Sequence, residues 1–178
     1  MRHQVYLSLG SNIDPERNLP LAVGRLTQVG RVVAVSSVWE TAPWATATPQ
    51  PNFVNGCLLL ETELTAAVLY AEVIETIETD LGRQRTGDRN APRPIDIDIM
   101  LFDQEITVVG RRQLPDPEIL ERPFIALLLA EIAPDYVHPE SGQTLAQLAQ
   151  RFARQRPGLR RRDEVRRRIL AAAGLSDR

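Results

Sequence analysis

The sequence predicts an α+β fold in which an antiparallel sheet carries helices packed on one face. Short stretches alternate apolar and polar residues with a period of two, which indicates strands, and longer stretches repeat apolar residues every three or four positions, which indicates helices. Their order along the chain is strand, helix, strand, strand, helix, strand. That order is typical of a ferredoxin-like sheet built from two split β-α-β units.

The first elements are separated by clear turn signals. A Gly-Ser-Asn turn follows the first strand, and Asp14 with Pro15 matches an N-cap followed by the first helical position. Three prolines and a lack of periodicity mark a long loop, which a compact domain of this size usually uses for function. In order, we expect a strand at 5–9, a helix from 14 to about 28, a strand at 31–38, the loop at 40–51 and a strand at 53–60.

The later elements follow the same rules. The strand at 53–60 places Phe53, Asn55, Cys57 and Leu59 on one face, because successive strand residues point to opposite sides. After it we expect a helix at 62–81, an arginine-containing loop, a strand at 95–101, a short strand at 105–109, an irregular segment at 112–121, and buried helices at 123–132 and 143–154.

Composition limits the classes of protein that fit. The 178 residues suit one domain with a small appendage, and no stretch approaches the ~18 consecutive apolar residues of a membrane span. Cys57 is the single cysteine, so an internal disulfide is excluded, and the N-terminus leads directly into a strand pattern without a secretory signal. We therefore expect a cytoplasmic protein without membrane attachment.

Charge is distributed unevenly along the chain. Residues 1–150 carry 11 arginines against 20 acids, whereas residues 151–178 carry 10 arginines against 3 acids. We expect a catalytic domain at 1–150 and an arginine-rich helical extension at 151–178. Within the extension, Val165 and Ile169 have helical spacing, which leaves three alternatives: a solvated helix end, a helix docked on the acidic body, or a basic arm for nucleic acid. Charge complementarity favours docking, with a helix that is dispensable for catalysis.

The most informative stretch is the strand at 95–101. Asp96 and Asp98 share one face, with Cα atoms roughly 6.5 Å apart at the usual strand rise, whereas Ile95, Ile97, Ile99 and Leu101 form an apolar stripe on the other. Two neighbouring carboxylates repel unless a cation lies between them. Hard oxygen ligands of this kind suit Mg²⁺, which typically takes one or two carboxylates together with substrate phosphates.

Residues around this strand provide complementary chemistry. Four arginines precede it, at 83, 85, 89 and 93, and guanidinium groups match phosphate oxygens in bidentate geometry. Phe53 and Asn55 pair a ring for stacking with an amide, which suits a flat heterocycle, and Phe124 after Arg122 can close a sandwich. Together these features indicate a site that transfers a nucleotide phosphate to a heterocyclic substrate.

Seven sequence blocks resemble the 6-hydroxymethyl-7,8-dihydropterin pyrophosphokinases, also called 2-amino-4-hydroxy-6-hydroxymethyldihydropteridine diphosphokinases. They are LSLGSN (7–12), SSVWETAPW (36–44), FVNG (53–56), IETDLGRQR (77–85), APRPIDIDIMLF (91–102), the LPDP segment with RPF (114–124), and AEIAPDYVHP (130–139). The resemblance implies a ferredoxin-like enzyme of folate biosynthesis that transfers pyrophosphate from ATP to the pterin, giving the pterin diphosphate and AMP.

The resemblance also implies roles for individual residues. Asp96 and Asp98 would hold two Mg²⁺ ions, and Arg83 and Arg93 would steady the transferring group. The implied nucleotide contacts are Glu78, Arg85, Arg93, Ile99 and Arg122, and the implied pterin contacts are Thr41, Pro43, Trp44, Phe53, Asn55 and Phe124. The expected partners are the two small-molecule substrates, with no nucleic acid and no membrane, and the expected state is a monomer or weak homo-oligomer.

Three positions depart from the pattern that the family commonly shows. Asn90 stands in place of tryptophan, Asp116 in place of histidine and Glu75 in place of glutamine. The sequence leaves two alternatives to the enzyme. One is a nucleic-acid-binding module, because RNA-binding domains share this fold and the tail is basic, although the body is acidic. The other is a catalytically weakened paralogue that acts as a partner subunit.

Overall fold

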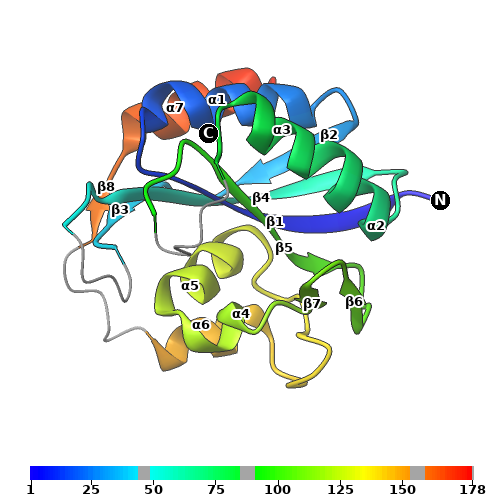
Figure 1. Ribbon diagram of the computed structural model, residues 1–178. Coiled ribbons are helices and arrows are strands. Elements are labelled where there is room, and N and C mark those ends of the chain that lie inside the picture. Colours follow the sequence, from blue (N-terminus) through cyan, green and yellow to red (C-terminus); the bar gives the residue numbers. More distant parts are fainter. Residues whose placement is uncertain (44–48, 85–90, 153–158, 178) are drawn as a thin grey trace.

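A computed structural model describes residues 1–43, 49–84, 91–152 and 159–177. Within these residues the fold is centred on a six-stranded antiparallel sheet with the order β5-β1-β4-β3-β8, in which β2 also pairs with β4 (Figure 1). The strands are β1 (His3–Ser11), β2 (Gly30–Val35), β3 (Trp39–Thr41), β4 (Phe53–Thr62), β5 (Asp96–Phe102) and β8 (Arg160–Arg161). The ferredoxin-like α+β class expected from the sequence is confirmed.

Helices cover the sheet from two sides, as Figure 1 shows. One side carries α1 (Pro15–Leu26), α2 (Ala66–Val68), the π-helix η1 (Leu69–Ile74), α3 (Glu75–Asp80) and α7 (Asp163–Ala172). The other carries α4 (Glu118–Glu121), α5 (Pro123–Ile132) and α6 (Leu145–Arg151), beside a hairpin of β6 (Thr107–Val109) and β7 (Arg112–Leu114). The second face was expected to be free, but α5 and α6 cover much of it.

Two cores hold these layers together. The first contains Val54, Leu58 and Leu60 of β4, and the second contains Cys57 and Leu59 of the same strand together with residues of α5 and α6. Because strand residues alternate between faces, one strand supplies both cores. Phe53 and Asn55 lie on the same face of β4 as Cys57 and Leu59 of the second core, as the sequence predicted, but nearer the start of the strand.

A register shift changes one detail of β5. Tyr6 pairs with Leu101 but Leu7 pairs with Ile99, so Met100 is the extra residue of a bulge. Leu101 was predicted on the stripe of Ile95, Ile97 and Ile99. It lies instead in the second core, and Phe102 takes its place in the first, because the bulge reverses the alternation.

Several element boundaries differ from those predicted. The helix expected at 62–81 begins at Ala66, because the Thr62 hydroxyl donates to the Val29 carbonyl at 2.6 Å and keeps Thr62 in β4. The segment 112–121, expected to be irregular, contains β7 and α4. These are three and four residues long, too short for a periodic pattern to show.

The arginine-rich tail is docked on the body. Val165 and Ile169 are 0% and 1% exposed, and Leu170 joins them in the first core, where α7 packs against α1. Before α7, β8 extends the sheet by pairing with β3. The predicted helix that rests on the body through Val165 and Ile169 is therefore confirmed. Among the described residues, no helix is both long and apolar enough to cross a membrane.

Candidate active site

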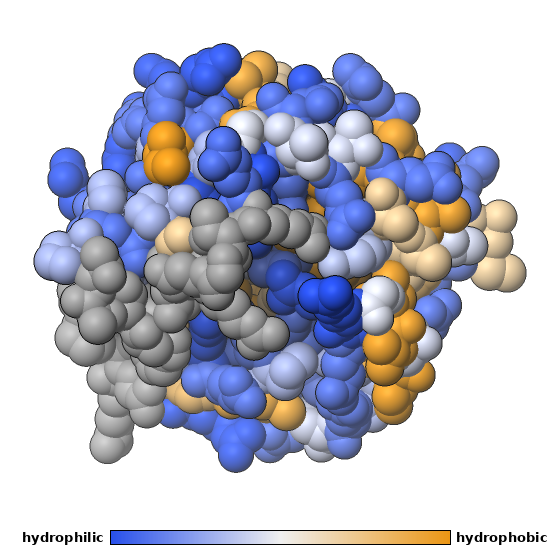
Figure 2. Space-filling model, in the orientation of Figure 1, coloured by the Kyte–Doolittle hydropathy of each residue, from blue (hydrophilic) through white to orange (hydrophobic). Residues whose placement is uncertain are grey.

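The candidate site lies where β1, β4 and β5 run side by side. Gly10 of β1 pairs with Asn55 on one side and with Asp96 on the other. A Cβ atom at Gly10 would lie 2.9 Å from Asn55 Oδ1 and 4.0 Å from the Asp96 Cβ atom. Because Gly10 has no side chain, the space between the Asn55 amide and the Asp96 carboxylate is not filled at this position. The face seen in Figure 2 is hollowed near its centre, where hydrophilic residues predominate.

Asp96 receives two arginines. Its Oδ1 atom lies 2.6 Å from an Arg83 nitrogen, and its Oδ2 atom lies 2.7 Å from an Arg93 nitrogen. Arg83 also pairs with Glu78, which is 4% exposed and accepts the Ile97 backbone N–H at 2.9 Å. Burial alone would lower the pKa of Arg83, but the charges of Asp96 and Glu78 outweigh it and the pKa is raised. Glu78 thus links α3 to β5 and helps to hold the Arg83 guanidinium group in position.

Asp98 is held differently. Its Oδ1 atom is buried and forms an ion pair with Arg112 of β7, without the alignment of a hydrogen bond. The pKa of Asp98 is raised well above its ordinary value, first because the side chain is buried and second because Asp96 is negatively charged. Asp116 stands behind Arg112, at 3.9 Å, and its own pKa is raised by burial. This side of the site is rich in buried negative charge.

The acids fit a hard cation. Asp96 and Asp98 present carboxylate oxygens on one face, and one buried oxygen of Asp98 has no hydrogen bond. Within the described part of the chain, no three His, Cys, Asp or Glu side chains gather to hold a metal ion. Asp96 and Asp98 would supply side-chain ligands to a cation here, and Mg²⁺ usually completes its coordination with water and phosphate.

The ring-binding side adjoins the acids. Asn55 donates from Nδ2 to the Thr41 hydroxyl at 2.8 Å, so the end of β3 is tied to β4. The Arg93 guanidinium lies over the Phe53 ring, 5.9 Å from its centre. Arg93 therefore touches both the ring and Asp96, and it connects the two halves of the site.

Asn12 connects the site to the segments beside it. Its Oδ1 accepts the Arg93 backbone N–H at 2.8 Å, and its own N–H donates to the Arg93 carbonyl at 3.1 Å. Its Nδ2 donates to Gln50 and to the Pro51 carbonyl, at 2.9 and 3.2 Å. Asn12, directly after β1, thus binds Arg93 on one side and both Gln50 and Pro51 on the other.

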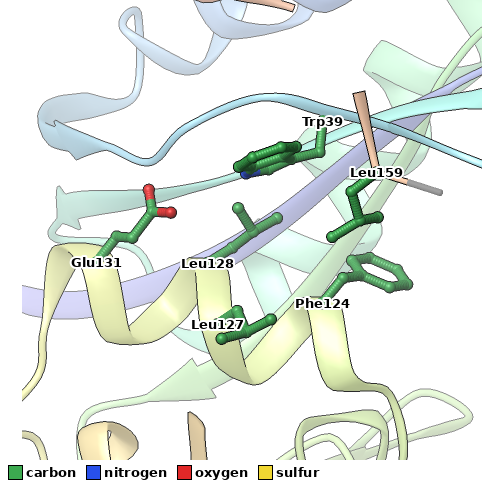
Figure 3. Close-up of a pocket in the computed structure, with 6 residues that line it drawn as sticks. All are labelled: Trp39, Phe124, Leu127, Leu128, Glu131 and Leu159. Carbon is green, nitrogen blue, oxygen red and sulfur yellow. The ribbon is translucent and has the colours of Figure 1, made fainter. Parts of the chain in front are cut away.

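The other candidates are more dispersed. Arg122, at the start of α5, pairs with Glu118 at 3.0 Å, and the Ile99 side chain is buried in the first core. Phe124 packs against the second core and lines a pocket with Trp39, Leu127, Leu128, Glu131 and Leu159 (Figure 3). Among the described rings no contact joins Phe124 to Phe53, so the predicted sandwich stays a prediction.

Some predicted residues lie outside the described part of the chain, and others were missed. Trp44, Arg85, Arg89 and Asn90 are outside it, whereas Pro43 lies two residues after the end of β3. Sequence reasoning gave no role to Gly10, Asn12 or Arg112. Gly10 and Asn12 stood in a matched block, but only the strand pairing shows what they touch. One feature of the sequence could have pointed to Arg112. Asp116, four residues later, is an acid at a position where the family commonly has histidine.

Comparison with known proteins decides the family. The sequence model described as 7,8-dihydro-6-hydroxymethylpterin-pyrophosphokinase (HPPK) matches residues 6–134. The chain belongs to this family. The match includes the acids, arginines, Phe53 and Asn55 of the candidate site, and it ends before α6 and the tail.

Relatives of this HPPK-family protein carry the name 2-amino-4-hydroxy-6-hydroxymethyldihydropteridine pyrophosphokinase. One from Synechocystis sp. is 36% identical over 148 residues, which are 82% of this chain and 74% of that protein. One from Methylorubrum extorquens is 42% identical over 137 residues, which are 75% of this chain and 85% of that protein.

Solved structures support the fold. The Plasmodium falciparum HPPK-DHPS crystal structures include an A437G form with a TM-score of 0.67, 15% sequence identity and coverage of 87% of this chain. This chain spans only 46% of that longer protein. At this identity the likeness concerns the fold alone.

Proposed function

We infer that this protein transfers the pyrophosphoryl group of ATP to 6-hydroxymethyl-7,8-dihydropterin, giving the pterin diphosphate and AMP, as a step of folate biosynthesis. Family membership supports the reaction class. The observation that carries the assignment to this site is the position of Arg93, which contacts Asp96 and lies over Phe53. The ATP phosphate chain, bound at Asp96, and the pterin ring, stacked on Phe53, would therefore both lie next to Arg93.

The phosphate half of the site neutralises charge. We propose that Asp96 and Asp98 hold two Mg²⁺ ions, which when bound would neutralise the phosphate chain and polarise its oxygens. Arg83 and Arg93 lie against the Asp96 carboxylate, and guanidinium groups in this position match the phosphate oxygens of a nucleotide bound beside it. Glu78 pairs with Arg83, and we propose that it lies at the nucleotide beside that arginine.

The pterin half of the site orients the substrate. Phe53 provides a ring face for stacking. Asn55 provides an amide beside Gly10, where no side chain blocks access. Thr41, which pairs with Phe53 and accepts a hydrogen bond from Asn55, borders the same edge. We propose that these residues, with Pro43, Trp44 and Phe124, hold the ring so that its hydroxymethyl group points toward the acids.

The reaction itself requires little covalent help from the protein. The pterin hydroxyl oxygen bonds to the β-phosphorus of ATP while the bond from that phosphorus to the oxygen on the α-phosphorus breaks. The hydroxyl proton is released and AMP leaves with the bridging oxygen. Catalysis of such a transfer depends mainly on positioning and on charge stabilisation. Both substrates are small molecules, and a cytoplasmic, monomeric or weakly self-associating enzyme is part of this proposal.

A direct assay tests the function. Purified protein is incubated with ATP, Mg²⁺ and the dihydropterin, and AMP and the pterin diphosphate are measured by chromatography. We expect equal amounts of both products, and no AMP when the pterin is left out. AMP without pterin diphosphate would indicate a hydrolase. No AMP from a folded protein that binds both substrates would support the weakened paralogue.

A further inference from the structure

Arg112 occupies a special place among the acids of the site. Its guanidinium group pairs with Asp98 and lies 3.9 Å from Asp116. Burial alone would lower the pKa of Arg112, but the charges of Asp98, Asp96 and Asp116 raise it. The residue therefore stays cationic between acids that belong to two different parts of the fold.

The support behind Arg112 is rigid. Asp116 donates its backbone N–H to the Met100 carbonyl and accepts the Glu118 N–H at its own carboxylate, both at 2.9 Å. Asp116 is 3% exposed, whereas the Arg112 side chain is 37% exposed. A fixed carboxylate thus lies beside an arginine side chain that is partly accessible to solvent.

A purely structural role does not explain this arrangement. Arg112 faces Asp98 through an oxygen that would also serve a metal ion, and the contact lacks hydrogen-bond alignment. A divalent cation at Asp98 therefore competes with Arg112 for that oxygen. Once displaced, the guanidinium group keeps Asp116 as a partner and retains N–H donors for another anion.

We propose that Arg112 is a nucleotide-binding residue that exchanges its contact with Asp98 for a phosphate oxygen of the Mg²⁺-bound nucleotide, while Asp116 holds it in place. This proposal rests on the proposed function, since it assumes a phosphate chain at Asp96 and Asp98. It also accounts for an acid at position 116. The cation on this side of the site comes from Arg112, and Asp116 positions it.

The exchange predicts effects of opposite sign on two ligands. The variant Arg112→Gln removes the competitor for Asp98, so Mn²⁺ alone, measured by electron paramagnetic resonance, should bind about three- to tenfold more tightly. The same variant loses a charge-assisted contact to phosphate. Binding of α,β-methylene-ATP with Mg²⁺, measured by titration calorimetry, should weaken about tenfold, as one such bond predicts.

Two further variants act as controls. Arg31→Gln removes an arginine that pairs with Glu61 at 2.9 Å, outside the site, and should leave both affinities unchanged. Arg112→Lys keeps the charge but loses the planar fork, and should weaken analogue binding about threefold. If Arg112→Gln does not fold, the lysine variant decides, because an unchanged analogue affinity in Arg112→Lys would then overturn the proposal.

The remaining outcomes are also decisive. Unchanged analogue binding in Arg112→Gln, or weaker binding of both ligands together, would mean that Arg112 only maintains the structure. The analogue cannot be cleaved between its α- and β-phosphates, so its binding does not depend on transfer. A wild-type protein that makes no pterin diphosphate would refute the proposed function while the Arg112 result could still hold.

Discussion

Two groups of arginines in this protein make the same kinds of contact and have different consequences. At the site, Arg83, Arg93 and Arg112 pair with acids, and Arg93 lies over Phe53 at 5.9 Å. In the tail, Arg162 and Arg166 pair with acids, and Arg161 lies over Trp39 at 5.6 Å. Ion pairs and arginine–ring contacts therefore occur both in the candidate binding site and in the tail that docks on the body, and they do not distinguish the two.

The acids differ between the two groups. Asp96 and Asp98 are neighbours on one face, and burial together with Asp96 raises the pKa of Asp98. In the tail, Arg162 joins acids from three elements, namely Glu16 of α1, Glu40 of β3 and Glu164 of α7. The hydrogen bond from Arg162 lowers the pKa of Glu164. The site concentrates negative charge that a cation would neutralise, whereas the tail pairs acids that are partly or fully exposed with arginines of its own.

The largest effect is expected from the acids of the site. Asp96→Asn and Asp98→Asn should each lower pyrophosphoryl transfer by at least about 100-fold, because each removes a charged metal ligand worth several kcal/mol in the transition state. Both variants should stay folded, because they remove one of two repelling charges. Transfer rates and melting temperatures measure the two effects.

Asp103→Asn is the matched control for these variants. Asp103 follows β5, has a φ of 44° that asparagine tolerates, and pairs with His3 outside the site. Transfer by Asp103→Asn should stay within about twofold of wild type, the scale of a surface change. Near wild-type turnover in Asp96→Asn or Asp98→Asn would refute the assignment of both acids to metal.

The next largest difference is expected between the ring contacted by the site arginines and the ring contacted by the tail arginines. Phe53→Leu should weaken pterin binding by roughly 1–3 kcal/mol, the range for lost stacking on a planar base, with a smaller effect on nucleotide binding. Trp39→Leu removes the ring of β3 over which Arg161 of the tail lies, and should weaken pterin binding less than Phe53→Leu does. Calorimetry with each ligand measures both. Equal losses for pterin and nucleotide in Phe53→Leu would identify Phe53 as a structural residue.

Much of this organisation could be predicted from the sequence because it depends on alternation. The period of two in residues 53–60 and 95–101 placed Phe53, Asn55, Asp96 and Asp98 on one face, and the strand pairing through Gly10 brings them together. Helical spacing identified Val165 and Ile169, two of the three buried residues of α7. The chemistry of the site followed from residue type once the shared face was known.

Other features depend on contacts between distant segments, which periodicity does not encode. The bulge at Met100 reverses the alternation of β5, and its cause lies in the pairing with β1. Arg112 faces Asp98 only because the β6-β7 hairpin folds beside β5. The second face is covered because α5 and α6 return across it, which local sequence patterns do not reveal.

Removing the tail should affect stability more than catalysis. Truncation after Gln150 exposes the part of the first core that Val165, Ile169 and Leu170 cover, and each such side chain stabilises the fold by about 1.5–3 kcal/mol. The melting temperature should fall clearly, whereas transfer by the folded fraction should stay within a few-fold of the full chain. Ile169→Ala should show a smaller form of the same effect.

This truncation also tests the division into a catalytic domain at 1–150 and an extension. Because β8 pairs with β3, and Thr41 at the end of β3 binds Asn55, a route from tail to site exists. A collapse of transfer in a truncated protein that is still folded would show that the tail supports the site through this route. The catalytic unit would then include the tail.

The smallest effect is expected from Arg162→Gln. The hydrogen bond from Arg162 lowers the pKa of Glu164 below its ordinary value of 4.5, and hydrogen bonds from Asn52 and Arg162 lower that of Glu40. A lowered pKa in the folded state means that the stabilising contribution is complete above pH 4.5 and is lost as the pH falls through the folded value. Melting temperatures of wild type and Arg162→Gln should therefore differ by a small, constant amount from pH 8 to about pH 5.5, and converge below pH 4.5. Arg167→Gln, on the exposed side of α7, should match wild type at every pH. A gap that persists in acid would mean that Arg162 acts through packing of its side chain, and the tail would then be anchored without help from its charges.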